Sequence, residues 1–381
     1  MLQRMLADCL DGKRGLFVQS PIIPYQTALF QRPQHIAHSF AKANFLVLYL
    51  TGKYDTGRHA YVQIAPGLML VSDQTEINKF GILMDIRGAL VSFYSTAPLF
   101  DFKTDIKRVR ENGNRVMYEY IDHISSDISS TWVDALSENY EYVSDDTFDI
   151  IVASAKSLID NLVQESKSTA ERVVYVPNAV NYENYVSSGA LIPPKSPLKS
   201  RFDGLKGPII GYFGAIAPWL WYELINNVTL SMQDVNFVII GPDYLGAQAR
   251  LIERANVLLT GPIEYKFLKY YARMFHVAMI PFAQGEIGET TSPLKLYEYF
   301  ALQVPVVTTS SMRECTQYDV KHADNSMDFA LELRKAIELR YVDSHRKKLR
   351  QLARSNTWDH RILPIIDRFL SLGMKDVPSA P

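Results

Sequence analysis

Residues 284–308, QGEIGETTSPLKLYEYFALQVPVVT, carry the pattern that says most about the fold. A helix should begin near Ser292, because serine is a favourable N-cap residue and Pro293 suits a first helical turn. Apolar residues follow at helical spacing, and Pro305 ends the helix before the β-branched run VVTT. The stretch therefore predicts a helix followed directly by a strand.

Two charged residues of this helix suggest an anion site. Lys295 falls in the first turn, where the helix dipole disfavours a cation. A phosphate bound at the exposed N–H groups of that turn would explain the lysine. Glu298 lies one turn further on the same face and could accept hydrogen bonds from sugar hydroxyls. Together these groups suit a nucleotide sugar. The alternative is an ordinary buried helix whose Lys295 and Glu298 merely pair in solvent.

Strands and helices alternate along the whole chain. The first series has strand-like segments at 15–20, 45–51, 62–72, 89–95, 115–122, 148–154 and 173–180, with helical segments at 32–44, 102–113, 131–142 and from Lys156. The second series has strand-like segments at 208–214, 236–241, 256–261, 276–282 and 304–310. This alternation predicts two doubly wound α/β domains with parallel sheets.

A stretch rich in proline, glycine, serine and lysine, at about 186–207, separates the two series and marks a linker. We therefore expect an N-terminal domain at 1–190 and a second domain at 191–355. Residues 356–381 contain a terminal segment with apolar residues at helical spacing.

Bulk composition excludes several classes of protein. A hydrophobic content of 47% and a charged content of 21% are those of a globular protein. The net charge of −1 gives no support for general nucleic-acid binding. Cys9 and Cys315 are the two cysteines, too few for a disulfide framework or a cysteine zinc site. Without a signal-peptide core or an uncharged apolar run of about 18 residues, we expect the bacterial cytosol.

The apolar run at 79–100 allows two interpretations. It is interrupted by isolated charges and followed by the basic segment IKRVRENGNR. Such a run can form a buried helix and strand, or an interfacial patch that holds the protein at the inner face of the cytoplasmic membrane.

Five motifs follow one another in this chain in the same order as in one known protein family. They are QRPQHIAHSF, YIDHIS, VPNAV, GYFGAI and SPLKLYEY. SPLKLYEY and the strand after it resemble the donor-binding region of group 1 glycosyltransferases of the GT-B fold. Within that group the chain is similar to bacterial exopolysaccharide enzymes of the teichuronic-acid type and to the glucuronosyltransferase of xanthan assembly. The resemblance spans residues 15–370.

This resemblance implies two Rossmann-like domains facing a cleft, with residues 356–381 crossing back to the N-terminal domain. It implies transfer of a sugar from a nucleoside-diphosphate sugar, expected to be UDP-linked, to a glycan or lipid-linked acceptor in bacterial surface polysaccharide synthesis. The implied donor-binding residues are Gly214, Ile263, Thr291, Ser292, Pro293, Leu294, Lys295 and Glu298.

One position departs from the family pattern. Family members have two glutamates that flank seven residues, and Glu298 fills the second place. Thr290 stands at the first, where retaining members use the glutamate to hold the donor sugar. The threonine argues against a retaining mechanism.

Asp122 is the expected catalytic residue. It closes the strand-like segment 115–122, and open α/β sheets build their sites at the carboxyl ends of strands. In an inverting transfer a carboxylate accepts the proton of the attacking hydroxyl, and Asp122 resembles the catalytic aspartate of the xanthan enzyme. The alternative is an aspartate that caps a turn. Arg32, His35 and His123 are candidates for contacts to acceptor or sugar, with a buried core histidine as the alternative for His35.

We expect no metal and no cofactor, because the chain lacks an Asp-x-Asp pair and a His-x-x-x-His pair. The helix terminus and Lys295 would then neutralise the leaving diphosphate. Other functions compatible with the sequence are a retaining GT-B enzyme, a sugar-nucleotide epimerase, and a non-catalytic glycan-binding paralogue.

Overall fold

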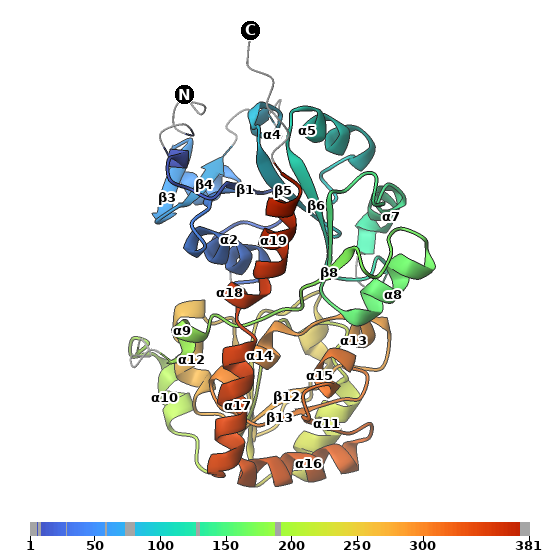
Figure 1. Ribbon diagram of the computed structural model, residues 1–381. Helices are drawn as coiled ribbons and strands as arrows, with labels where there is room; N and C mark the ends of the chain where they lie inside the picture. Colours follow the sequence, from blue (N-terminus) through green and yellow to red (C-terminus); the bar gives the residue numbers. More distant parts are fainter. Residues whose placement is uncertain are drawn as a thin grey trace. The chain divides into compact units, whose positions relative to one another are not determined.

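Two compact units make up the chain (Figure 1). The first comprises Met1–Pro177 and Trp358–Pro381, and the second comprises Asn178–Thr357. The computed structural model describes residues 6, 9–27, 29–57, 59–72, 81–126, 130–186 and 192–373. The boundary predicted at 190/191 lies outside the described residues. The structure assigns α9 (Tyr182–Val186) to the second unit. The division between the units, after Pro177, therefore lies before the linker-like stretch at about 186–207.

The described part of the first unit contains an eight-stranded sheet with the order β3-β4-β2-β1-β5-β6-β7-β8. Its strands pair in parallel, except for the antiparallel pair β3–β4. The strands are β1 (Leu16–Gln19), β2 (Leu46–Thr51), β3 (Tyr61–Ala65), β4 (Leu68–Ser72), β5 (Ala89–Tyr94), β6 (Arg115–Tyr120), β7 (Ile150–Ala153) and β8 (Val173–Tyr175).

Helices alternate with these strands, as a parallel sheet requires. They are α2 (Arg32–Lys42), α3 (Lys53–Thr56), α4 (Gly81–Asp85), α5 (Lys107–Glu111), α7 (Val133–Glu141), α8 (Lys156–Gln164), α18 (Trp358–Arg361) and α19 (Leu363–Ser371). The predicted polar helix at 102–113 is split, because a π-helical turn at Phe102–Ile106 precedes α5. In the described part of the run at 79–100, β5 is a fully buried strand between β1 and β6, as the core interpretation predicts.

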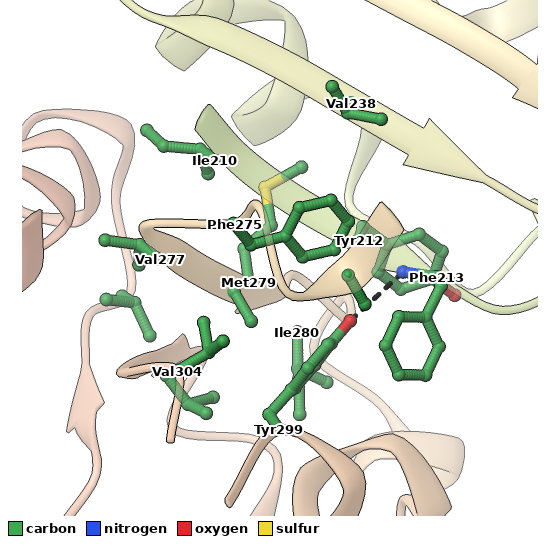
Figure 2. Close-up of a cluster of buried hydrophobic side chains, with 14 of the residues drawn as sticks. Ile210, Tyr212, Phe213, Val238, Phe275, Val277, Met279, Ile280, Tyr299 and Val304 are labelled. Carbon is green, nitrogen blue, oxygen red and sulfur yellow. Dashed lines mark hydrogen bonds between the residues drawn. The ribbon is translucent and has the colours of Figure 1, made fainter. Parts of the chain in front are cut away.

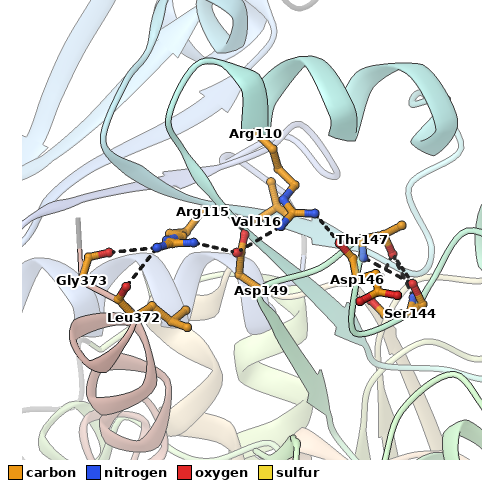
Figure 3. Close-up of polar contacts among 9 residues, drawn as sticks. All are labelled: Arg110, Arg115, Val116, Ser144, Asp146, Thr147, Asp149, Leu372 and Gly373. Atoms are coloured by element: carbon orange, nitrogen blue, oxygen red, sulfur yellow. Dashed lines mark hydrogen bonds and ion pairs between the residues drawn. The ribbon is translucent and has the colours of Figure 1, made fainter. Parts of the chain in front are cut away.

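A polar network joins the last helix to the sheet of this unit (Figure 3). Arg115, at the start of β6, donates to the carbonyl oxygens of Leu372 and Gly373 at 2.9 and 3.2 Å. The same guanidinium pairs with Asp149 at 3.1 Å, and Asp149 also accepts the N–H of Val116 at 2.9 Å. A cation at a helix C-terminus is favourable because it opposes the helix dipole. The network fixes the end of α19 in the first unit.

The described part of the second unit contains a six-stranded parallel sheet with the order β11-β10-β9-β12-β13-β14. Its strands are β9 (Ile209–Phe213), β10 (Asn236–Ile240), β11 (Val257–Gly261), β12 (Val277–Ile280), β13 (Val306–Thr308) and β14 (Lys321–His322). Its other helices are α10 (Pro197–Asp203), α11 (Tyr222–Ser231), α12 (Tyr265–Ala272), α13 (Glu286–Thr290), α14 (Leu294–Ala301), α15 (Arg313–Thr316), α16 (Ser326–Leu339) and α17 (Asp343–Ser355).

Apolar side chains of β9, β12 and α14 form the centre of this second core (Figure 2). Gly211 is required for packing there, because a Cβ at this position would lie 2.1 Å from the ring of Phe275. The N–H of Phe213 donates to the hydroxyl of Tyr299 at 3.0 Å. This bond ties the end of β9 to α14, and so positions the residues that follow both. In the part of the chain that the structure describes, no helix is both long and apolar enough to cross a membrane.

Candidate functional site

Two glycines meet at the carboxyl ends of β9 and β10. Gly214 has φ +140° and Gly241 has φ +154°, a region that side chains strongly disfavour. A Cβ on Gly241 would lie 1.8 Å from the carbonyl oxygen of Gly214. Neighbouring strand ends of a parallel sheet are where α/β proteins place ligands. Because neither glycine has a side chain, the backbone itself forms the surface at this edge of the sheet.

Lys295 lies against this glycine junction. A Cβ on Gly214 would lie 2.8 Å from Cε and 3.2 Å from Nζ of the lysine. The ammonium lies over the rings of Tyr212 and Phe282, at 5.2 and 5.0 Å from their centroids. Burial lowers the pKa of Lys295 to about 8, although Cys315 and Glu298 act in the opposite direction. Among the described residues, Lys295 forms no hydrogen bond and no ion pair, so its charge faces aromatic rings and the glycine backbone.

Glu298 lies one turn along α14 and is 4% exposed. Its Oε1 accepts a hydrogen bond of 2.6 Å from the hydroxyl of Tyr185, on α9. Burial raises the pKa of Glu298 to about 7, against the lowering effects of Tyr185 and Lys295. Burial and, to a lesser extent, the neighbouring Glu298 carboxylate also raise the pKa of Tyr265. Glu298 therefore does not pair with Lys295 in solvent, because the carboxylate is buried among tyrosines, although α14 is a buried helix as that alternative also expected.

The start of α14 differs from the prediction. Its N-cap is Pro293, whereas Ser292 was expected to cap the helix. The Ser292 hydroxyl instead accepts the N–H of Asn178 at 3.0 Å, and the Ser292 carbonyl accepts the Asn178 side-chain amide at 2.6 Å. This long-range pairing takes the serine oxygen away from the helix and holds the segment before α14 in place.

The other donor-site candidates lie around this segment. Thr291, Leu294 and Lys295 are half-buried, whereas Ser292 and Pro293 are buried. Thr290, at the place of the missing glutamate, is 5% exposed, and its hydroxyl donates to the carbonyl of Glu286 at 2.8 Å within α13. Thr290 thus offers no carboxylate at this position, and its hydroxyl forms a hydrogen bond within α13.

Ile263 follows β11, the strand beside β10. It is half-buried and packs against the core of the second unit. Gly261 at the end of β11 has φ +68°, which turns the chain into the loop that carries Ile263. The same loop leads to Tyr265, the first residue of α12. The loop that carries Ile263 is therefore followed by Tyr265, which interacts with Glu298.

In the first unit, Asp122 and His123 follow β6 and are both half-buried. The Nδ1 atom of His123 lies 3.1 Å from the Tyr120 hydroxyl and 3.1 Å from the side-chain amide of Asn161. These two neighbours orient the imidazole. The parallel strand β6 ends at Tyr120, so the predicted aspartate lies two residues beyond its carboxyl end and does not close the strand itself.

Arg32 and His35 are buried in the first unit. Arg32 is 4% exposed, pairs with Glu119 at 2.7 Å and donates to the Val176 carbonyl at 2.8 Å. His35 is 3% exposed and stacks on Trp358 with ring centroids 5.3 Å apart. Burial lowers the pKa of His35 to about 3, so the imidazole is neutral. Both side chains contribute to packing of this unit, and His35 matches the core-histidine alternative.

Sequence reasoning missed several residues that complete the site. Asn178 lies in the VPNAV motif, which was noted only for its place in the motif order. Gly241 follows the strand NFVIIG, and this strand-glycine pattern is the same signal that identified Gly214. Tyr185 and Tyr265 have no local signal, because their role depends on Glu298, which is distant in the sequence.

Residues 207–338 match the family model described as "Glycosyl transferases group 1". The second unit thus contains a domain similar to group 1 glycosyltransferases. This domain contains Gly214, Ile263, Lys295 and Glu298.

In the part of the chain that the structure describes, no group of three or more His, Cys, Asp or Glu side chains could hold a metal ion.

A curated relative extends the likeness beyond the domain. The chain is 26% identical over 219 residues to TuaH of Bacillus subtilis (strain 168), described as a teichuronic acid biosynthesis glycosyltransferase. The match covers 55% of this chain and 54% of TuaH, so the chain spans about half the length of that relative.

Solved structures with the GT-B fold match nearly the whole chain. Sucrose-phosphate synthase from Thermosynechococcus elongatus aligns at 13% identity with a TM-score of 0.67, covering 94% of this chain and 99% of its own. Anabaena HepE in complex with UDP aligns at 13% identity with a TM-score of 0.62 and the same coverages. The UDP-forming α,α-trehalose-phosphate synthase from Burkholderia xenovorans, with glucose-6-phosphate, aligns at 11% identity with a TM-score of 0.65, covering 93% and 99%. The predicted GT-B fold of two α/β units is confirmed.

Proposed function

We propose that the protein transfers a sugar from a nucleoside-diphosphate sugar to a glycan or a lipid-linked acceptor in bacterial surface polysaccharide synthesis. The observation that carries this proposal is the Lys295 ammonium, which forms no ion pair among the described residues and lies against side-chain-free backbone at Gly214. A diphosphate is the complementary ligand for such a group, since it supplies the missing negative charge.

Glu298 supports a nucleoside as part of that ligand. One of its oxygens accepts from Tyr185, and a carboxylate has further acceptor capacity for hydroxyl groups. Ribose hydroxyls next to a diphosphate would match the spacing of one helical turn between Lys295 and Glu298. The loop at Ile263 would lie against the base. HepE, whose structure contains UDP, and the UDP-forming trehalose-phosphate synthase support uridine as the first nucleoside to test.

The transfer reaction that we propose inverts the anomeric carbon. The acceptor oxygen attacks that carbon as Asp122 accepts the hydroxyl proton, and the bond from carbon to the diphosphate oxygen breaks. The diphosphate leaves with the bonding electrons, and Lys295 stabilises its charge without a metal ion. Thr290, which has no carboxylate to offer the donor sugar, favours inversion over retention. TuaH, as a teichuronic acid biosynthesis enzyme by name, supports a surface polysaccharide as the product.

Calorimetric titration with UDP tests the donor site. A charge-assisted contact contributes about 1.5–3 kcal/mol, so Lys295→Ala should weaken UDP binding by roughly ten- to a hundredfold. Glu298→Ala should weaken it through the ribose. Lys347→Ala, which removes an exposed lysine of α17, is the matched control and should leave binding unchanged. Unchanged UDP affinity in both site variants would refute the assignment of the site.

A further inference from the structure

A second concentration of positive charge lies elsewhere in the glycosyltransferase domain. Five arginines line one cavity of about 510 Å³: Arg273, Arg340, Arg346, Arg350 and Arg354. The chain as a whole has a net charge of −1, so this accumulation is local. Among the described residues that line the cavity there is no aspartate or glutamate. The volume is within the range of about 300–1,000 Å³ that is typical of small-molecule sites.

Three of these arginines form a stripe on one helix. Arg346, Arg350 and Arg354 are four residues apart on α17, so their side chains emerge from one face. Like charges at this spacing repel one another and destabilise a helix. The repulsion within this stripe therefore reduces the stability of α17, and a negatively charged ligand would relieve it.

The partners of this stripe leave most of its charge uncompensated. Arg350 donates to the Gln303 side-chain oxygen at 3.1 Å, and Arg354 donates to the Tyr182 hydroxyl at 3.1 Å. Both of these acceptors are neutral. Arg346 pairs with Asp343 at 3.5 Å, but that carboxylate is 84% exposed, and such surface pairs are weak.

The remaining two arginines build the wall of the cavity. Arg340 donates to the carbonyl oxygen of Gln303 at 2.7 Å, beyond the end of α14. Arg273 donates to the carbonyl oxygen of Tyr185 at 2.7 Å. Burial and the positive charge of Arg346 lower the pKa of Arg340. Both α9 and α17 pack on α14 (Figure 1), so three elements hold the cavity in shape.

We propose that this arginine cavity is a binding site for a phosphate-bearing ligand, separate from the donor site. Guanidinium groups bind phosphate through two parallel hydrogen bonds, and several of them match a group with two or more negative charges. Lys295 and Glu298 do not line the cavity. Tyr185 borders both sites, because it lines the cavity and its hydroxyl donates to Glu298. The phosphate can belong to a free compound or to a lipid headgroup, and the test separates these two sources.

Pyrophosphate is the soluble probe, titrated calorimetrically into the full chain at low salt. All variants carry Lys295→Ala, which removes the ammonium of the donor site. The protein should bind pyrophosphate, and Arg346→Gln/Arg350→Gln should weaken binding at least about tenfold. Lys347→Gln/Lys348→Gln removes two charges from the same helix but none from the cavity, and should bind as before. Circular dichroism checks that each variant is folded, and the single variant Arg346→Gln replaces the double one if the latter unfolds.

Vesicles provide the second arm of the experiment. The same proteins are sedimented with phosphatidylcholine vesicles that contain or lack phosphatidylglycerol. Pyrophosphate binding that depends on the arginines identifies a free phosphate compound. Absence of pyrophosphate binding, together with arginine-dependent sedimentation on phosphatidylglycerol, identifies a lipid phosphate. The proposal is overturned if neither probe binds, or if the arginine and lysine double variants bind equally well.

Discussion

Replacing Glu298 by glutamine should stabilise the second unit at pH 8 much more than at pH 5. The carboxylate is 4% exposed, and burial raises its pKa from an ordinary 4.5 to about 7. Glutamine stays neutral at both pH values and retains an oxygen that can accept from Tyr185. The substitution therefore removes the buried charge while preserving the hydrogen bond.

The sign of the effect follows from proton binding. Between pH 4.5 and 7 the folded protein holds the proton of Glu298 more tightly than the unfolded chain does. Stability is thus lost as the pH rises through this window, and the full loss is present above pH 7. A difference of about 2.5 pKa units corresponds to at most about 3 kcal/mol. This difference already includes the attraction of Lys295, which lowers the pKa of Glu298.

Differential scanning calorimetry at pH 5 and pH 8 measures this effect. Relative to wild type, the unfolding temperature of Glu298→Gln should rise by about 5–10 °C more at pH 8 than at pH 5, for a unit of this size. Glu338→Gln, an exposed change on α16, should show no such dependence. Tyr185→Phe should show the opposite sign, because it removes the hydroxyl that stabilises the carboxylate. If Glu298→Gln gains nothing at pH 8, the burial argument is wrong.

Three further outcomes are expected. Asp122→Asn should bind UDP normally but transfer sugar about 10²–10⁴ times more slowly, and NMR of the product should show inverted configuration; near-normal turnover or a retained configuration would exclude Asp122 as the inverting base. Sugar transfer should persist in excess EDTA, and a rate that chelation abolishes and magnesium restores would contradict leaving-group stabilisation by Lys295. Arg32→Met should destabilise the first unit by about 3–5 kcal/mol, because it leaves Glu119 buried without its partner. Chemical denaturation should show that Arg32→Met/Glu119→Gln recovers most of this loss, and no recovery would argue against the ion pair.

The sequence predicts the fold well because its strands are short apolar runs with local signals. The segments at 45–51 and 89–95 became β2 and β5, since buried parallel strands are apolar on both faces. The π-helical turn at Phe102–Ile106 was not predictable, because its apolar pattern is that of an ordinary helix.

The candidate site was predictable only where its residues lie close together in the chain. Lys295, Glu298 and Gly214 had local signals, in a helix start and a strand end. Tyr185, in contrast, is 113 residues from Glu298, and Asn178 is 114 residues from Ser292. Arg32 was expected near a ligand, yet its partner Glu119 lies 87 residues away and is fully buried. Pairings at such separations leave no periodicity that a single sequence reveals.

Lys295 and Glu298 share a physical property that bears on function. Burial lowers the pKa of Lys295 to about 8 and raises the pKa of Glu298 to about 7, so each environment disfavours the charged form. Both groups are charged together mainly between pH 7 and 8. A ligand that brings a diphosphate to Lys295 and hydroxyl donors to Glu298 would stabilise these charged forms and shift both pKa values back toward ordinary ones. Binding would then contribute to the stability of the unit itself, because a ligand that binds only the folded state shifts the folding equilibrium. An anionic ligand would thus be favoured next to Lys295, which forms no ion pair among the described residues.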